Sequence, residues 1–207
     1  MGPVVHLPQR NGISDGLDIQ LSLSAHKING PKGVGALFVR RGTPIKPIIF
    51  GGGQEKQLRS GTENVASIVG FSEAVSLADS ERNYFNKQCE KLTKKLIKNI
   101  STSIPGAHLN GHPSKRLSNI VNFSFEGVEG EPILIGLDFA GIYASSGSAC
   151  TSGSLEPSHV LIATGLDPHL AVGSIRFSFS STNSEDEIDY VIKELSQIIE
   201  NLRGMAN

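Results

Sequence analysis

A lysine that could form a Schiff base lies at the end of an alternating segment, in the sequence Ser24-Ala25-His26-Lys27. Apolar and polar residues alternate from residue 17 to residue 24, which predicts a half-buried strand, and α/β folds place their sites just beyond strand ends. Most lysines are only solvated surface charges. Here the hydroxyl of Ser24, the imidazole of His26 and a glycine-rich turn offer groups that hold a phosphate beside the amine of Lys27. This combination suits a cofactor that forms a Schiff base.

A second reactive group is the thiol of Cys150, in a run of small residues from Ser145 to Ser154. Such a segment has little to bury, so we expect an accessible thiol that moves to its substrate. Cys89 instead stands at helical spacing among apolar residues, which predicts a packing role. Two cysteines in such different settings do not suggest a disulfide and favour a reducing compartment, the cytoplasm.

Two arginines offer anion ligands. The loop from Gly51 to Thr62 ends in Arg59 and two hydroxyl residues, just before a predicted helix. Its sequence fits equally well a linker that caps the helix and a loop whose side chains bind an anion. Arg176 lies on the polar face of a predicted strand at 175–179, as a surface charge or as a fork for a carboxylate.

A metal site is not expected. His108 and His112 share helical spacing, but an Asn-Gly pair separates them and Pro113 follows, which predicts a loop.

Composition excludes several classes of protein. The 207 residues are 38% hydrophobic, with a formal net charge of −1, which is typical of a soluble globular chain with one or two domains. A nearly neutral chain lacks the basic surface that binds nucleic acid. No apolar run approaches the roughly 20 residues of a membrane-spanning helix, so no membrane partner is expected.

The pattern along the chain predicts an α/β fold. Strands are expected at 17–24, 35–39, 120–125 and 175–179, and the proline-containing segment 44–50 fits only an edge strand or an extended connection. Apolar spacing predicts one long helix over 65–100, or two with a bend near Asn83, and a short helix at 131–139. A last helix starts at the capping box Ser184 to Glu187 and ends at Gly204.

Four segments, taken together, resemble one family. In chain order they are SAHKINGPKGVGALFVRR, GGGQEKQLRSGTENV, SSGSACTSGSLEPSHVL and SIRFS. They are similar to the cysteine desulfurases of the NifS/IscS type, which are class V aminotransferases. The resemblance implies a fold type I pyridoxal-phosphate enzyme that takes sulfur from L-cysteine, releases L-alanine and serves iron–sulfur cluster and thio-cofactor assembly. Residues 1–80 would be the end of the large cofactor-binding domain, with the start of the connecting helix, and residues 81–207 the small C-terminal domain.

The resemblance also assigns roles to residues. Lys27 would bind pyridoxal 5'-phosphate as the Schiff-base lysine and carry protons, while Ser24 and His26 would help to hold the cofactor phosphate. Thr62 would reach the phosphate of the partner subunit's cofactor, which implies a homodimer. Arg176 would bind the carboxylate of the substrate.

Sulfur transfer needs a separate soft nucleophile, and the resemblance assigns this role to Cys150. The residue would carry the sulfur as a persulfide to an iron–sulfur scaffold or another acceptor protein. Its long loop is similar to that of the group with a mobile cysteine loop.

The resemblance covers only about the second half of such an enzyme. The stacking histidine, the aspartate at the pyridine nitrogen and the glutamine at the ring oxygen would come from the preceding half. We therefore expect a truncated or split enzyme, completed by a separate N-terminal half. Two alternatives stay open: a non-catalytic docking module for iron–sulfur assembly partners, and another fold type I enzyme such as a selenocysteine lyase or an aminotransferase.

Overall fold

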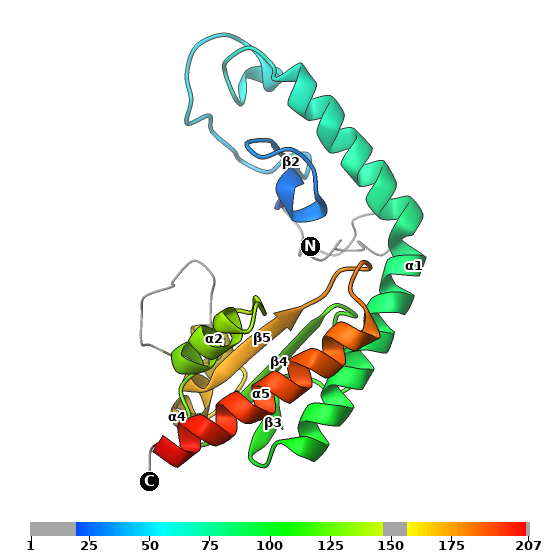
Figure 1. Ribbon diagram of the computed structural model, residues 1–207. Helices are drawn as coiled ribbons and strands as arrows, with labels where there is room; N and C mark the ends of the chain where they lie inside the picture. Colours follow the sequence, from blue (N-terminus) through cyan, green and yellow to red (C-terminus); the bar gives the residue numbers. More distant parts are fainter. Residues whose placement is uncertain (1–19, 147–156, 206–207) are drawn as a thin grey trace. The chain divides into compact units, whose positions relative to one another are not determined.

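A computed structural model describes residues 20–146 and 157–205 (Figure 1). The chain forms two compact units, unit 1 (residues 1–82) and unit 2 (residues 83–207). The helix α1 (Val65–Ser103) contributes to both. The assignment of residues 1–80 and 81–207 to the large and small domains of a longer enzyme stays a prediction.

Unit 1 contains a two-stranded antiparallel ribbon. β1 (Gln20–Ser24) pairs with β2 (Gly35–Val39) so that Leu21 lies opposite Phe38. Both predicted strands are confirmed within the described residues. The expected half-burial of the first is wrong: most side chains of both strands are exposed, because a ribbon of two strands leaves its faces open unless another layer covers them. The segment 44–50 forms no strand and is an irregular connection.

The helix α1 is continuous over its 39 residues. It has no break at Asn83, so the single-helix alternative is confirmed. In unit 2 its buried residues recur at spacings of three and four, at Cys89, Leu92, Leu96 and Ile100, which is the period of a helix packed on one face.

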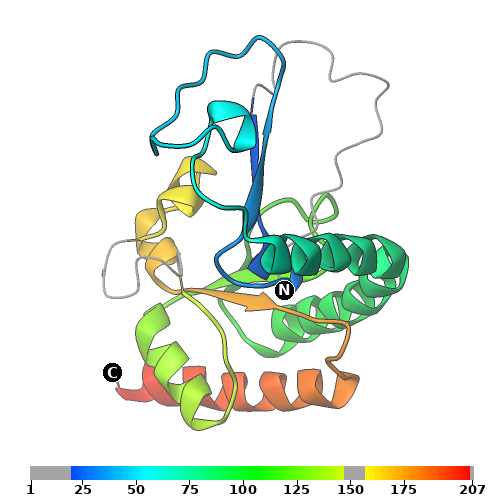
Figure 2. The ribbon, with the colours of Figure 1, turned by 90° about the horizontal axis from the view of Figure 1, so that it is seen from above.

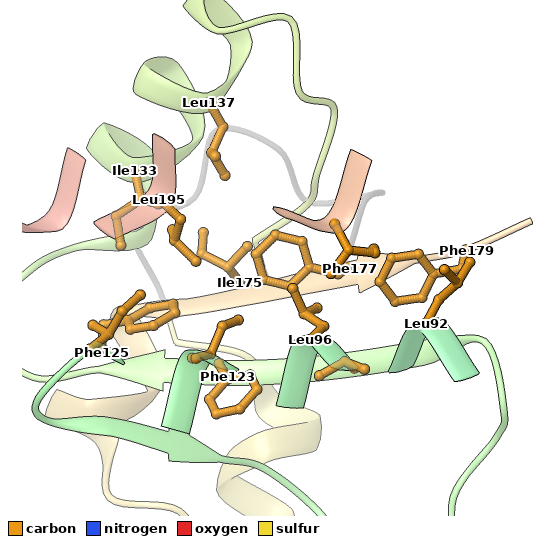
Figure 3. Packing of buried hydrophobic residues seen from close by; sticks show 14 of the residues in the cluster. Leu92, Leu96, Phe123, Phe125, Ile133, Leu137, Ile175, Phe177, Phe179 and Leu195 are labelled. Atoms are coloured by element: carbon orange, nitrogen blue, oxygen red, sulfur yellow. The ribbon is translucent and has the colours of Figure 1, made fainter. Parts of the chain in front are cut away.

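Unit 2 contains a three-stranded antiparallel sheet in the order β3–β4–β5. The strands are β3 (Ala107–Leu109), β4 (Ile120–Phe125) and β5 (Ser174–Ser178). Figures 2 and 3 show α2 (Gly130–Phe139) and α5 (Glu185–Met205) on one side of the sheet, with α3 (His159–Ala163) and α4 (Pro168–Val172) on the other.

The core of unit 2 lies between the sheet and the helices α1, α2 and α5 (Figure 3). Side chains of a strand alternate between its two faces, and one face of β4 and β5 is apolar throughout. The buried residues of this face are Val121, Phe123, Phe125, Ile175 and Phe177. The opposite face therefore carries the polar residues of the same strands.

The last helix begins as predicted and ends differently. The amide of Glu187 donates to Ser184 Oγ at 3.2 Å and the amide of Ser184 donates to Glu187 Oε2 at 2.9 Å, which confirms the capping box. Gly204 lies inside α5 rather than closing it. The sequence analysis missed β3, α3 and α4, because segments of three to five residues are too short to show a period. No helix within the described ranges has both the length and the apolarity to cross a membrane.

Candidate active-site residues

Lys27 and His26 lie on a tight turn of unit 1. The 3₁₀ helix η1 (Ala25–Ile28) follows β1 directly, and Asn29 ends it in the left-handed conformation at φ 62°. Ala25 is fully buried, whereas Ser24, His26 and Lys27 are exposed. The turn thus anchors one small side chain and presents a hydroxyl, an imidazole and an amine to the outside.

Two glycines let this turn approach α1. A Cβ on Gly30 would lie 3.0 Å from Ala25 Cβ and 3.2 Å from Ala74 Cβ, and a Cβ on Gly70 would lie 2.7 Å from Pro31 Cγ. The 2.7 Å contact is shorter than real Cβ atoms make, and the contacts of 3.0 and 3.2 Å are tighter than most, so a side chain at either glycine requires its neighbours to shift. The amide of Ala25 donates to Val34 O at 3.1 Å, and the amide of Gly30 donates to Ala25 O at 2.9 Å. The position of Lys27 therefore depends on the absence of a side chain at Gly30 and at Gly70.

The loop from Gly51 to Thr62 closes on itself. Ser60 Oγ donates to Gly52 O at 2.7 Å, and the amide of Gly61 donates to Gln54 Oε1 at 3.2 Å. Thr62 follows as an exposed residue just before α1, where the Asn64 side chain accepts from the amide of Ser67 at 3.3 Å. The loop is therefore held by its own hydrogen bonds, the side chain that caps α1 is Asn64 beyond the loop, and Thr62 is exposed.

Arg176 is the middle residue of β5, on the polar face of the sheet in unit 2. Its side chain is half-buried, and its Nε is buried without a hydrogen-bond partner among the described residues. A buried donor without a partner is destabilising, so this guanidinium is suited to an anion that supplies the missing acceptor.

The backbone of Arg176 also holds the segment before the Cys150 loop. The amide of Arg176 donates to Ser145 O at 2.6 Å, and the amide of Ser145 donates to Arg176 O at 3.2 Å. Cys150 itself lies outside the described residues, five positions after Ser145 in the sequence. Cys89 is fully buried, which confirms its packing role, and desolvation by burial raises the pKa of its thiol.

The sequence analysis did not select three linked polar residues, Asn110, Asn122 and Ser124, of which Asn122 lies opposite Arg176. Asn110 Nδ2 donates to Asn122 Oδ1 at 2.6 Å and to Ser124 Oγ at 2.8 Å. The signal was present, since Asn122 and Ser124 alternate with apolar residues along β4.

His108 and His112, which are not expected to bind a metal, form hydrogen bonds with other residues. His108 contacts Glu126 Oε1 at 2.6 Å through Nε2, and His112 Nδ1 accepts from the amide of Lys115 at 2.9 Å. Within the ranges described by the structure, no cluster of possible metal ligands occurs.

Comparison with known proteins places the chain in a family. The family model described as "Aminotransferase class-V" matches residues 14–191. The chain belongs to the class V aminotransferase family. Enzymes of this family use pyridoxal 5'-phosphate, so the resemblance and its cofactor are confirmed.

Relatives of this class V chain include several cysteine desulfurases. It is 48% identical over 186 residues to the cysteine desulfurase IscS of Methanosarcina thermophila, covering 90% of this chain and 46% of that protein. It is 49% identical over 188 residues to the IscS of Clostridium botulinum, with 90% and 47% covered, and 47% identical over 186 residues to the NifS of Azotobacter vinelandii, with 90% and 46% covered. The chain spans about half the length of the curated relatives it matches.

Solved structures agree with this family. A NifS-like protein matches with a TM-score of 0.77 and 40% identity over 88% of this chain and 46% of its own. A NifS-like protein from Rickettsia africae matches with a TM-score of 0.78 and 34% identity over 88% and 48%. The predicted fold class, α/β of pyridoxal-phosphate fold type I, is confirmed.

The residues of the η1 turn fit this cofactor chemically. Lys27 supplies an exposed primary amine, and Ser24 and His26 supply exposed groups that bind a phosphate. The buried Ala25 between them fixes the turn without filling the space outside it. These three residues would therefore hold the cofactor, with Lys27 as the covalent ligand.

Proposed function

We propose that this chain is the C-terminal half of a cysteine desulfurase, which takes sulfur from L-cysteine, releases L-alanine and carries the sulfur as a persulfide on Cys150. The observation that supports this most strongly is the 48–49% identity to proteins named cysteine desulfurases over 186–188 residues. The matching segment includes the turn of Lys27, the strand of Arg176 and the loop of Cys150.

The reaction divides among the residues as follows. Pyridoxal phosphate supplies the electron sink at the substrate Cα. Lys27 Nζ binds the cofactor and then moves protons, and Arg176 binds the substrate carboxylate. The Cys150 thiolate attacks the substrate sulfur, so that an S–S bond forms and the C–S bond breaks. The electron pair of the C–S bond stays on the carbon, which takes up a proton and becomes the methyl group of L-alanine.

The remaining half of the fold must come from another polypeptide segment. In unit 1 the side chains of Ile48 and Phe50 are 89% and 81% exposed, and those of Val65 and Val69 are 65% and 61% exposed. Large apolar side chains exposed to this degree are typical of interaction sites. The edges of the β1–β2 ribbon also have no strand partner among the described residues. Both features support the proposal of a complementary N-terminal half, separate or in the same polypeptide.

The assembled enzyme would be a homodimer in which Thr62 binds the cofactor phosphate of the partner subunit. The sequence contains two cysteines in dissimilar settings, which suits the cytoplasm, where persulfide sulfur would pass to an iron–sulfur scaffold or another acceptor protein. Variants of Lys27 and Cys150 distinguish the loss of a chemical role from the loss of the folded state.

The proposal is tested by mass spectrometry of Cys150. The chain, alone and mixed with the N-terminal half of a curated relative, is incubated with pyridoxal phosphate and L-cysteine. We expect one additional sulfur atom on the Cys150 peptide and L-alanine in solution, both lost in Lys27→Ala and retained in Lys32→Ala, which alters an exposed lysine nearby. If alanine forms but Cys150 stays unmodified, the desulfurase role of this thiol is wrong. If neither product forms in the mixture, the proposed activity is wrong.

One observation favours a second function, as a docking module for iron–sulfur assembly partners. Phe139 and Tyr143 are 89% and 87% exposed and precede the Cys150 loop, and exposed aromatic residues are enriched in interfaces. This function predicts partner binding that survives Lys27→Ala without any persulfide. A selenocysteine lyase would release selenium from selenocysteine faster than sulfur from cysteine in the same mixture.

A further inference from the structure

The polar face of unit 2 forms an ordered row of side chains across its strands. Asn122 lies directly opposite Arg176 in the β4–β5 register, and Ser145 bridges to Arg176 on the other side. Asn110 donates its amide to Asn122 O at 2.9 Å. Directly opposite residues of antiparallel strands project from the same face, so Asn122 and Arg176 are neighbours on this face.

The backbone hydrogen bonds show how close these two residues are. Both the amide and the carbonyl of Arg176 are bonded to Ser145, which lies away from β4. Asn122 and Arg176 therefore form a non-hydrogen-bonded pair of β4 and β5. In such pairs the Cα atoms are about 4.5 Å apart and the side chains are closer than in the alternate pairs.

The orientation of the Asn122 amide is fixed by its neighbours. Its Oδ1 accepts from Asn110 Nδ2 at 2.6 Å, and the same Nδ2 donates to Ser124 Oγ at 2.8 Å. Asn110 is held in turn by Arg116, whose Nη2 donates to Asn110 O at 3.0 Å. Because its oxygen is occupied, Asn122 has its two Nδ2 hydrogens left, and these have no acceptor among the described residues.

We propose that Asn122 is a second ligand of the substrate carboxylate, beside Arg176. This inference rests on the proposed function, in which Arg176 binds that carboxylate. A carboxylate has two oxygens and accepts about four hydrogen bonds. Arg176 leaves a buried Nε–H without an acceptor, and Asn122 presents N–H donors on the same face. Asn110 is the positioning residue, because its Nδ2 holds the Asn122 oxygen and so fixes the direction of the Asn122 amide.

In this arrangement Arg176 supplies the positive charge, and Asn122 supplies N–H donors whose direction is fixed by Asn110. A hydrogen bond to a charged group contributes more than one between neutral groups. Asn122→Asp keeps the size of the side chain and its acceptor for Asn110. It removes both donors and places a negative charge beside the carboxylate, so it should weaken binding rather than folding.

The test is an NMR titration of the full chain with L-alanine, the proposed product, followed at the Asn122 side-chain amide and the Arg176 Nε–H. L-Alaninamide, which lacks the carboxylate, is the control ligand, and Ser178→Ala, an exposed residue of the same face, is the control variant. We expect saturable shifts at both groups with L-alanine only. Asn122→Asp should weaken binding by about tenfold or more, and Ser178→Ala should leave it unchanged.

The possible results separate this inference from the proposed function. Saturable shifts at Arg176 alone, or unchanged binding in Asn122→Asp, would overturn the role of Asn122 and leave that of Arg176 intact. Unchanged binding in both Asn122→Asp and Arg176→Lys, or no shift at either group, would overturn both. Equal shifts with L-alaninamide would show that the carboxylate is not the recognised group.

Discussion

Replacing Gly30 by alanine should loosen the η1 turn that presents Lys27. Gly30 does not have a positive φ, so alanine is compatible with its backbone and the effect is steric. The added Cβ would lie 3.0 Å from both the Cβ and the carbonyl oxygen of Ala25, and 3.2 Å from Ala74 Cβ. Two of these contacts are within the turn and the third is with α1, so relieving them requires the turn to change its own shape and to shift slightly from Ala74.

The magnitude follows from two opposing effects. Overpacking a close contact destabilises the folded state by about 1–3 kcal/mol. Alanine also restricts the unfolded chain, which stabilises the folded state by about 0.4–1 kcal/mol. The central values of the two effects leave unit 1 less stable by about 1.3 kcal/mol, which is a factor of roughly ten in its opening equilibrium. Reaction of Lys27 with pyridoxal phosphate should weaken in parallel.

Hydrogen exchange measures this loss locally. The reporters are the amides of Ala25 and Gly30, which donate to Val34 O and Ala25 O. The matched control is Gly204→Ala in α5, where a Cβ meets no atom within 4 Å. Alanine should stabilise that exposed helical position by up to about 1 kcal/mol and leave unit 1 unchanged. Exchange of the two reporter amides at the wild-type rate in Gly30→Ala would refute the packing argument.

Three further predictions concern other parts of the chain. Hydrogen bonds from the Asn183 side chain and the Ser184 amide lower the pKa of Glu187. The stabilisation that ionised Glu187 gives the folded state is therefore full above the ordinary carboxyl pKa and is lost as pH falls through the lowered pKa. Urea titrations should show a smaller loss of unfolding free energy at acid pH in Glu187→Gln than in the wild type. Gln57 has a φ of 66°, so Gln57→Gly should stabilise the folded state by about 0.5–1 kcal/mol in urea titrations. The control is Glu63→Gly, at an exposed position without positive φ, which should destabilise the folded state in the same assay. Because burial raises the pKa of the Cys89 thiol, a maleimide should label it only after unfolding, as peptide mapping would show.

Long periodic segments could be predicted from the sequence. The α1 and α5 helices and the strand β4 follow from apolar spacing alone, and the capping box located the start of α5. The end of α5 could not be predicted from Gly204, because glycine is tolerated within an exposed helical turn at a modest cost. The exposure of β1 was missed because alternation predicts a covered face and cannot show whether the covering layer belongs to the same polypeptide.

The candidate site was predictable only in part. Ser24, His26 and Lys27 adjoin in the sequence, so local pattern and family resemblance found them together. The dependence of this turn on Gly30 and Gly70 comes from contacts with Ala74 and Pro31, which sequence spacing does not show. Asn110 joins Asn122 across two strands, and such a pairing needs the sheet register.

The most direct test of the central claim is the visible absorption spectrum of the chain with pyridoxal phosphate, before and after borohydride reduction, followed by peptide mapping. We predict a Schiff-base band for the wild-type chain and for Lys32→Ala, its loss in Lys27→Ala, and a reduced cofactor attached to the Lys27 peptide. A band of equal intensity in Lys27→Ala, or attachment spread over the surface lysines, would contradict the account.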